Sequence, residues 1–248
     1  MNQIKRLDPV VVATGMVNEL FPACQGALLA GSVIRGEATH TSDLDIVVFD
    51  HKIENSYRES FFANGWPIEL FVHNETSYKQ FFQNDCLRGR PTLPNMVVEG
   101  IVLKGEQYIN QVKKEAKQLL DAGPETWTLE TIDIKRYFIT DTLEDLEGTN
   151  KRDEALFIAN NLAVLISEFY LRTNSQWVGN SKWVVRALKK YDTNFAEMFV
   201  DAFDSFYRDE EKNKVITLVD NVLKPYGGRL FEGFSVGKKE RMRENNAR

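Results

Sequence analysis

Two aspartates separated by one residue stand at the start of an apolar run, and together they could hold a metal ion. The run from residue 44 to residue 49 is short, rich in β-branched residues and free of alternation, which predicts a strand covered on both faces. Residues i and i+2 of a strand share a face, so the carboxylates of Asp43 and Asp45 point the same way. Carboxylates this close repel each other unless a cation lies between them, and hard oxygen ligands suit Mg²⁺. The pair therefore predicts a magnesium site.

A glycine–serine pair precedes the aspartates and directly follows another short apolar stretch. Residues 26 to 30 predict a strand, and Gly31 and Ser32 come immediately after it. Glycine lets a backbone approach a phosphate closely, and serine adds a hydroxyl donor. Gly-Ser pairs also form ordinary turns, which is the better interpretation of the pair taken alone. Because Mg²⁺ is usually bound together with substrate phosphates, the pair and the aspartates together predict a metal-dependent phosphate site.

A third acidic residue lies further along the chain, in the stretch from residue 66 to residue 72, which also predicts a strand. Because side chains alternate between the two faces of a strand, Glu69 and Phe71 share one face and Ile68 lies on the other. If this strand pairs beside the aspartate strand, Glu69 faces the same pocket and can take a proton from an acceptor hydroxyl. An exposed glutamate on an edge strand would produce the same pattern, and the residues alone leave both interpretations open.

The elements around these residues change in character near Gly123-Pro124. Before that point we expect, besides the three strands, helices at 9–21, 76–87 and 106–120 and a strand at 96–103. After it only helical periodicity occurs, and we expect helices at 129–146, 153–171, 182–191, 195–207 and 210–223. The sequence thus predicts an α+β protein: a small mixed β-sheet domain with helices at 1–123, an all-α helical-bundle domain at 124–237 and a disordered tail at 238–248.

Composition and charge limit the partners. The 248 residues include 31 basic and 36 acidic side chains, a net charge of −5, which disfavours a nucleic-acid substrate and suits a cationic small molecule better. No apolar stretch approaches the roughly 20 residues of a membrane span, and the N-terminus lacks a signal-peptide pattern. Cys24 and Cys86 are far apart, so neither a disulfide framework nor a zinc site is indicated. We expect a cytoplasmic protein without a membrane partner, and the oligomeric state is not readable.

The combined motif resembles the nucleotidyltransferase superfamily typified by DNA polymerase β. Members carry Gly-Ser, a loop, Asp-hydrophobic-Asp and a third acidic residue on the next strand. In this chain the pattern reads GSVIRGEATHTSDLDIVV and later PIELFV, over about residues 28 to 72. Arg35 and Ser42 also match members that carry GSxxRG and SDxD. The resemblance implies a nucleotide site that includes Gly31, Ser32, Arg35 and Ser42, a metal site at Asp43 and Asp45, and catalysis by these aspartates and Glu69.

The layout of the whole chain resembles the antibiotic nucleotidyltransferases, which adenylylate aminoglycosides and related drugs. The segment QWVGNSKW, residues 176 to 183, is similar to the helical domain of the streptomycin/spectinomycin type, whose lysine for ATP phosphates maps onto Lys182. A snorkelling lysine at a helix start is an equally good interpretation of Lys182. The resemblance implies Mg²⁺-dependent transfer of AMP from ATP, or of another nucleoside monophosphate, to a hydroxyl of a small molecule such as an aminoglycoside-like antibiotic, with release of pyrophosphate.

Two other functions fit the same pattern. One is a non-catalytic, antitoxin-like or regulatory interaction protein built on this fold, and the other is an enzyme that nucleotidylates a protein. A degraded binding module would not need Gly31, Ser32, Asp43, Asp45 and Glu69 together, so their presence favours the enzyme. Neither the acceptor nor a role in drug resistance follows from a superfamily resemblance. Acidic residues at expected helix ends could meet a cationic substrate, although the helix dipole also explains two of them, Asp153 and Glu154.

Overall fold

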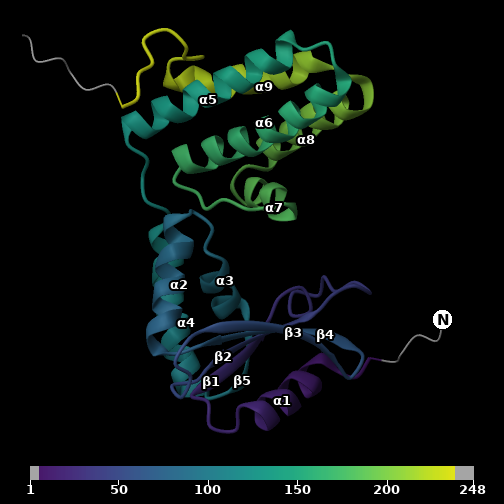
Figure 1. Cartoon of the computed structure of the whole chain (residues 1–248), viewed down its shortest axis with the longest axis vertical. Helices are drawn as coiled ribbons and strands as arrows, with labels where there is room; N and C mark the ends of the chain where they lie inside the picture. The colour runs from purple at the N-terminus through teal and green to yellow at the C-terminus, as the bar shows by residue number, and fades with distance from the viewer. Residues whose placement is uncertain (1–5, 238–248) are drawn as a thin grey trace, which may run out of the picture. The chain divides into compact units, whose positions relative to one another are not determined.

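The computed structural model describes residues 6 to 237 of the chain, and the expected tail at 238–248 lies outside the described residues. The contacts between Cα atoms divide the chain into two compact units, Met1–Glu125 and Thr126–Arg248, and the expected division after residue 123 falls close to this one. The first unit contains a five-stranded mixed sheet with helices and the second is helical (Figure 1). The protein is therefore α+β, as its sequence predicts.

The sheet has the order β3-β4-β2-β1-β5. Its strands are β1 (Gly26–Ala30), β2 (Leu44–Phe49), β3 (Tyr57–Ala63), β4 (Trp66–His73) and β5 (Ile101–Lys104). β2 and β4 run parallel, whereas the other neighbouring pairs are antiparallel. The predicted strands that carry the aspartates and Glu69 are thus direct neighbours at the centre of the sheet.

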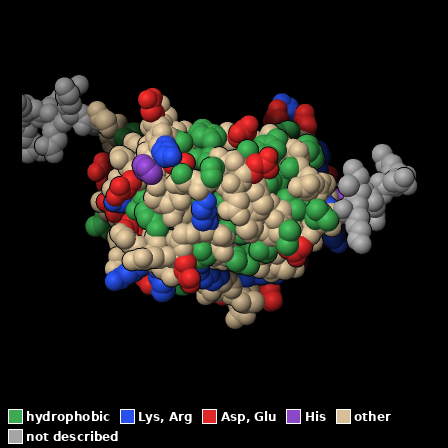
Figure 2. Space-filling view, turned by 90° about the horizontal axis from the view of Figure 1, so that it is seen from below, with side chains coloured by type: hydrophobic (Ala, Val, Ile, Leu, Met, Phe, Trp, Pro, Cys, Tyr) green, Lys and Arg blue, Asp and Glu red, His purple; other side chains and the backbone are tan. Residues whose placement is uncertain are grey.

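Helices cover both faces of the central strands (Figure 1). The helices of this unit are α1 (Pro9–Leu20), α2 (Glu75–Leu87), α3 (Thr92–Glu99) and α4 (Glu106–Ala122). The core against α1 takes Ile46 and Val48 from β2, and the core formed with α2, α3 and α4 takes Val47 and Phe49. Because helices cover both faces of β2, its residues do not alternate between apolar and polar, as predicted. On the face seen in Figure 2, acidic and basic side chains are both spread among exposed hydrophobic ones.

Two expectations about this unit are wrong. β3 was not expected, because most of its residues are exposed and only Phe61 and Ala63 at its end pack against the core. The expected strand at 96–103 is correct only for residues 101–103, which belong to β5, because residues 96–99 form the end of α3 and Gly100 follows them. The valines at 97 and 98 favour a strand locally, but Leu93 and Val97 are buried one helical turn apart in the core, and this packing overrides the local preference.

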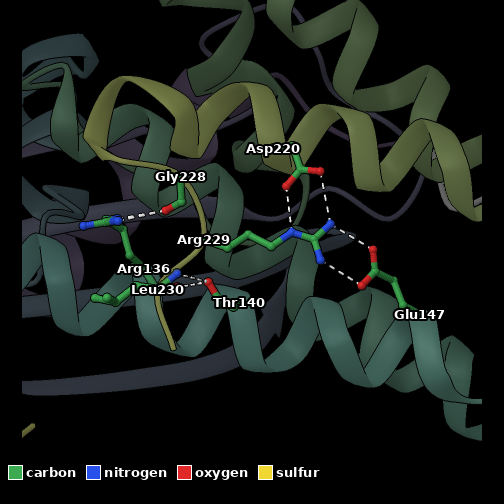
Figure 3. Close-up of polar contacts among 7 residues, drawn as sticks. All are labelled: Arg136, Thr140, Glu147, Asp220, Gly228, Arg229 and Leu230. Carbon is green, nitrogen blue, oxygen red and sulfur yellow. Dashed lines mark hydrogen bonds and ion pairs between the residues drawn. The ribbon is translucent and has the colours of Figure 1, made fainter. Parts of the chain in front are cut away.

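The second unit is a bundle of five α-helices among its described residues. They are α5 (Leu129–Gly148), α6 (Arg152–Thr173), α7 (Lys182–Tyr191), α8 (Thr193–Asp209) and α9 (Lys212–Leu223), followed by a short 3₁₀ turn. Arg229 lies in the segment after α9 and connects it to two helices (Figure 3). Its guanidinium donates to Asp220 on α9 and, at 2.8 Å, to both carboxylate oxygens of Glu147 on α5. The predicted helical half is confirmed.

Helix α6 is, among the described residues, the one that is long and apolar enough to cross a membrane by length and composition, which the sequence interpretation did not anticipate. Core helices of globular units satisfy the same test. Ala159, Leu162, Ile166 and Phe169 of α6 are fully buried in the hydrophobic core of the second unit, and α6 packs there against the other helices. We therefore interpret α6 as a core helix.

Candidate active site

Three carboxylates converge where β2 and β4 lie side by side. The parallel register sets Asp45 directly opposite Glu69, and Asp43 precedes β2 by one residue. One carboxylate oxygen from each of the three lies within 4.8 Å of the others, and all three residues are half-buried. The expectation that Glu69 faces the aspartates is confirmed. Three hard oxygen ligands within reach of one ion fit Mg²⁺.

Burial and the two neighbouring carboxylates raise the cost of ionising Asp45. The pKa of Asp45 is raised from 3.8 to about 6, first because burial disfavours its charged form and then because Asp43 and Glu69 repel it. Arg35 and Arg58 act in the opposite direction. Arg35 and Arg58 only reduce the repulsion among the carboxylates, whereas a bound divalent cation would remove it. Both the donor atoms and the electrostatics of the site therefore fit a metal ion.

Gly31 brings the backbone against the Asp45 carboxylate. Its φ of +86° is a conformation that favours glycine, and a Cβ at this position would lie 2.0 Å from Asp45 Oδ2. No other residue type fits there without moving the carboxylate. The turn after β1 is therefore held against the carboxylate site, where the predicted phosphate contact requires it to be.

Ser32 and Ser42 hold the loop between β1 and β2. The hydroxyl of Ser32 donates to Ser42 Oγ at 3.1 Å, and Ser42 Oγ accepts from the backbone amide of Thr39 at 2.8 Å. The backbone carbonyl of Ser32 accepts from the amide of Glu37 at 2.9 Å. These bonds shape the turn that follows Gly31, and they give the buried Ser42 a clear structural role. Direct contact of either serine with a nucleotide stays a prediction.

Arg35 lies beside the turn and pairs with two carboxylates. Its guanidinium contacts Glu37 at 3.1 Å and Glu99, the last residue of α3, at 2.5 Å. Glu99 also accepts from the backbone amide of Gly31. Sequence reasoning missed Glu99, because it was assigned to a strand and lies 64 residues from Arg35. No local sequence signal connects the two.

Arg58 is the second charged residue that sequence reasoning missed. It lies on β3, ion-pairs with Glu69 and places its guanidinium 4.9 Å from the centre of the Phe71 ring. A signal for its strand was present. Asn64-Gly65, both with positive φ, form the turn between β3 and β4, and this dipeptide between two extended runs is a strong indicator of a β-hairpin.

The remaining predicted residues lie in the second unit. Lys182 is the exposed first residue of α7, and its contact with a triphosphate stays a prediction. The acidic residues at the junction of α5 and α6 line a cavity of about 670 Å³, and these are Glu144, Asp145, Asp153 and Glu154. The carboxylate site described above is built from the first unit alone.

We expect Asp45→Asn to stabilise the metal-free protein above neutral pH. The folded pKa of Asp45 exceeds its ordinary value, so the folded protein binds more protons between pH 3.8 and about 6, and the free energy of unfolding falls as pH rises through this interval. The free energy of unfolding of the variant should be about 3 kcal/mol higher than that of the natural chain at about pH 8, with no difference below the ordinary pKa. Thermal unfolding followed by circular dichroism across pH measures this, and equal pH profiles would contradict it.

Comparisons with known proteins add little. No known family matches the sequence, and no curated protein matches it. Among solved structures, the chain is similar to a nucleotidyltransferase-like protein from Exiguobacterium sibiricum 255-15, with a TM-score of 0.47 and 13% identity, over 88% of this chain and 75% of that one. A likeness of this size assigns neither a family nor an activity, so the function must be inferred from the residues of the site.

Proposed function

We propose that the protein is a Mg²⁺-dependent nucleotidyltransferase that moves AMP from ATP to a hydroxyl of a small molecule and releases pyrophosphate. The observation that carries this proposal is the cluster of Asp43, Asp45 and Glu69, whose carboxylate oxygens lie within 4.8 Å of one another beside the glycine turn. Carboxylates in this arrangement serve phosphoryl transfer, in which catalysis consists mainly of positioning and charge stabilisation.

Asp43 and Asp45 would hold the metal ion, because their carboxylate oxygens lie within 4.8 Å of each other and Asp43 repels the charged form of Asp45. When bound, Mg²⁺ supplies neutralisation of the charge that develops on the phosphates. The backbone at Gly31 and the guanidinium of Arg35 would contact the triphosphate, since both are donors that suit phosphate oxygens.

Glu69 would act as the general base. The acceptor hydroxyl gives its proton to a carboxylate oxygen of Glu69, its oxygen forms a bond to the α-phosphorus, and the bond from that phosphorus to the bridging oxygen breaks, so that pyrophosphate leaves. Arg58 contacts the Glu69 carboxylate from β3 and would keep it oriented until the acceptor binds. The net charge of −5 supports a cationic acceptor of the aminoglycoside kind.

The reaction is tested by incubating the whole chain with Mg²⁺ and ATP labelled at the α-phosphate. Pyrophosphate release and transfer of the label are followed across aminoglycosides, lincosamides and fractionated cell extract. Label on a small molecule is the expected result. Label on a protein would keep the chemistry and change the acceptor class. If the protein binds no nucleotide in the presence of Mg²⁺, the enzyme proposal fails and the interaction-protein alternative takes its place.

Glu69→Gln separates the role of a base from that of a metal ligand. Loss of a general base typically costs about 10²–10⁴-fold in rate, so turnover should fall by that factor while the affinity for MgATP changes little. Steady-state kinetics and calorimetric binding measure the two effects. Glu59→Gln is the matched control, because Glu59 is an exposed carboxylate on β3 that lies on the opposite face of the strand from Arg58. Equal losses of turnover and affinity would identify Glu69 as a metal ligand instead.

A further inference from the structure

One carboxylate oxygen of Glu99 contacts two hydrogen-bond donors at the glycine turn. Glu99 Oε1 accepts from Arg35 Nη1 at 2.5 Å and lies 3.4 Å from the backbone nitrogen of Gly31. A guanidinium and a backbone amide at a glycine turn are the donors that phosphate oxygens use. A carboxylate of the protein itself therefore lies where an anionic ligand would bind.

The fold delivers Glu99 to this position. It is the last residue of α3, and Leu93 and Val97 anchor that helix in the core beneath β1. The Glu99 side chain is 27% exposed, so it can turn toward water without leaving a charge buried and unpaired. A carboxylate and a phosphate oxygen repel each other and need the same two donors, so they cannot occupy the position together.

We propose that Glu99 fills a phosphate-oxygen position in the nucleotide-free protein, and that the triphosphate displaces it from Arg35 and from the amide of Gly31. This inference rests on the proposed function, because it assumes a nucleotide at the same turn. Glu99 then weakens nucleotide binding, while it keeps the Arg35 side chain beside the turn until the nucleotide arrives.

The test is the dissociation constant of MgATP, measured by calorimetry on the whole chain. Glu99→Gln keeps the shape of the side chain and removes its charge, and it should tighten binding about fivefold, the size expected for release of a partly exposed ion pair. Glu37→Gln is the matched control. Glu37 also pairs with Arg35, through Nε, whereas Glu99 contacts both Nη1 of Arg35 and the amide of Gly31. It should change the affinity less than about twofold. The melting temperatures of the variants, including a second variant, Glu99→Ala, show whether a change in affinity reflects a loss of structure.

A second arm uses the Arg35→Gln background. If Glu99 acts by occupying Arg35, most of the gain from Glu99→Gln should disappear there, leaving less than about a twofold change. An undiminished gain would overturn the inference, because it would show repulsion at a distance instead of displacement. Unchanged or weaker binding by Glu99→Gln would also overturn it and would make Glu99 a residue that positions Arg35 for the phosphates. If neither the natural chain nor Glu99→Gln binds MgATP, the proposed function falls and this inference with it.

Discussion

Replacing both Asp43 and Asp45 by asparagine is expected to abolish nucleotidyl transfer while the protein stays folded. The two carboxylates supply the charge that would hold Mg²⁺, and a neutral amide pair cannot replace it. Metal ions contribute several kcal/mol to phosphoryl transfer, so the rate with labelled ATP should fall by at least about 10³-fold. The assay is transfer of the α-phosphate label under saturating Mg²⁺.

The fold of this variant is checked independently of its activity. Asp45 is destabilising when it is ionised in the metal-free protein, so the double variant should melt at the same temperature as the natural chain or higher at neutral pH. Added Mg²⁺ should raise the melting temperature of the natural chain and leave that of the variant unchanged. Retained activity would exclude the carboxylates as the metal site, and a lowered melting temperature would mean that the loss reflects unfolding.

The central part of the site was predictable because its geometry is local. Two aspartates one residue apart in an unbroken apolar run share a face in any strand, and that run is buried on both faces as expected. To predict the position of Glu69, the pairing of β2 with β4 must also be known. Once the two strands are paired, the alternation of side chains along each strand decides which of them meet. The helical second half followed from its periodicity alone.

The parts that the sequence did not reveal depend on distant contacts. Arg58 reaches Glu69 because β3 pairs with β4, and β3 is an edge strand most of whose residues are exposed. Glu99 reaches Arg35 only because α3 packs under β1, although the valines of α3 favour a strand locally. Both missed residues are charged partners of predicted ones. The hairpin turn at Asn64-Gly65 could have placed Arg58 near Glu69, whereas no spacing along the chain connects Glu99 to Arg35.

Gly31→Ala should harm the site although it changes none of the carboxylates. A residue with a side chain is strained at φ +86°, and its Cβ would lie 2.0 Å from Asp45 Oδ2. The strain costs about 1–3 kcal/mol, and the overlap must be relieved by moving the carboxylate or the turn. Displacement of a catalytic group by about 1 Å can cost about 10²-fold in rate, so activity should fall at least that far.

Gly36→Ala is its matched control. Gly36 has a comparable φ of +70°, but nothing lies within 4 Å of the Cβ it would gain. The control therefore carries the backbone strain without the contact to Asp45. Chemical denaturation should show that Gly31→Ala loses about 1–3 kcal/mol more free energy of unfolding than Gly36→Ala, in the range typical of overpacking.

The contact with Asp45 can be isolated by a double substitution. In the Asp45→Ala background the carboxylate that the new Cβ would strike is gone, so Gly31→Ala should cost little more than Gly36→Ala does. Transfer activity should stay absent in that background, because a metal ligand is missing. If Gly31→Ala is equally destabilising with and without the Asp45 carboxylate, the close approach of the turn to that carboxylate does not explain the glycine, and backbone conformation alone does.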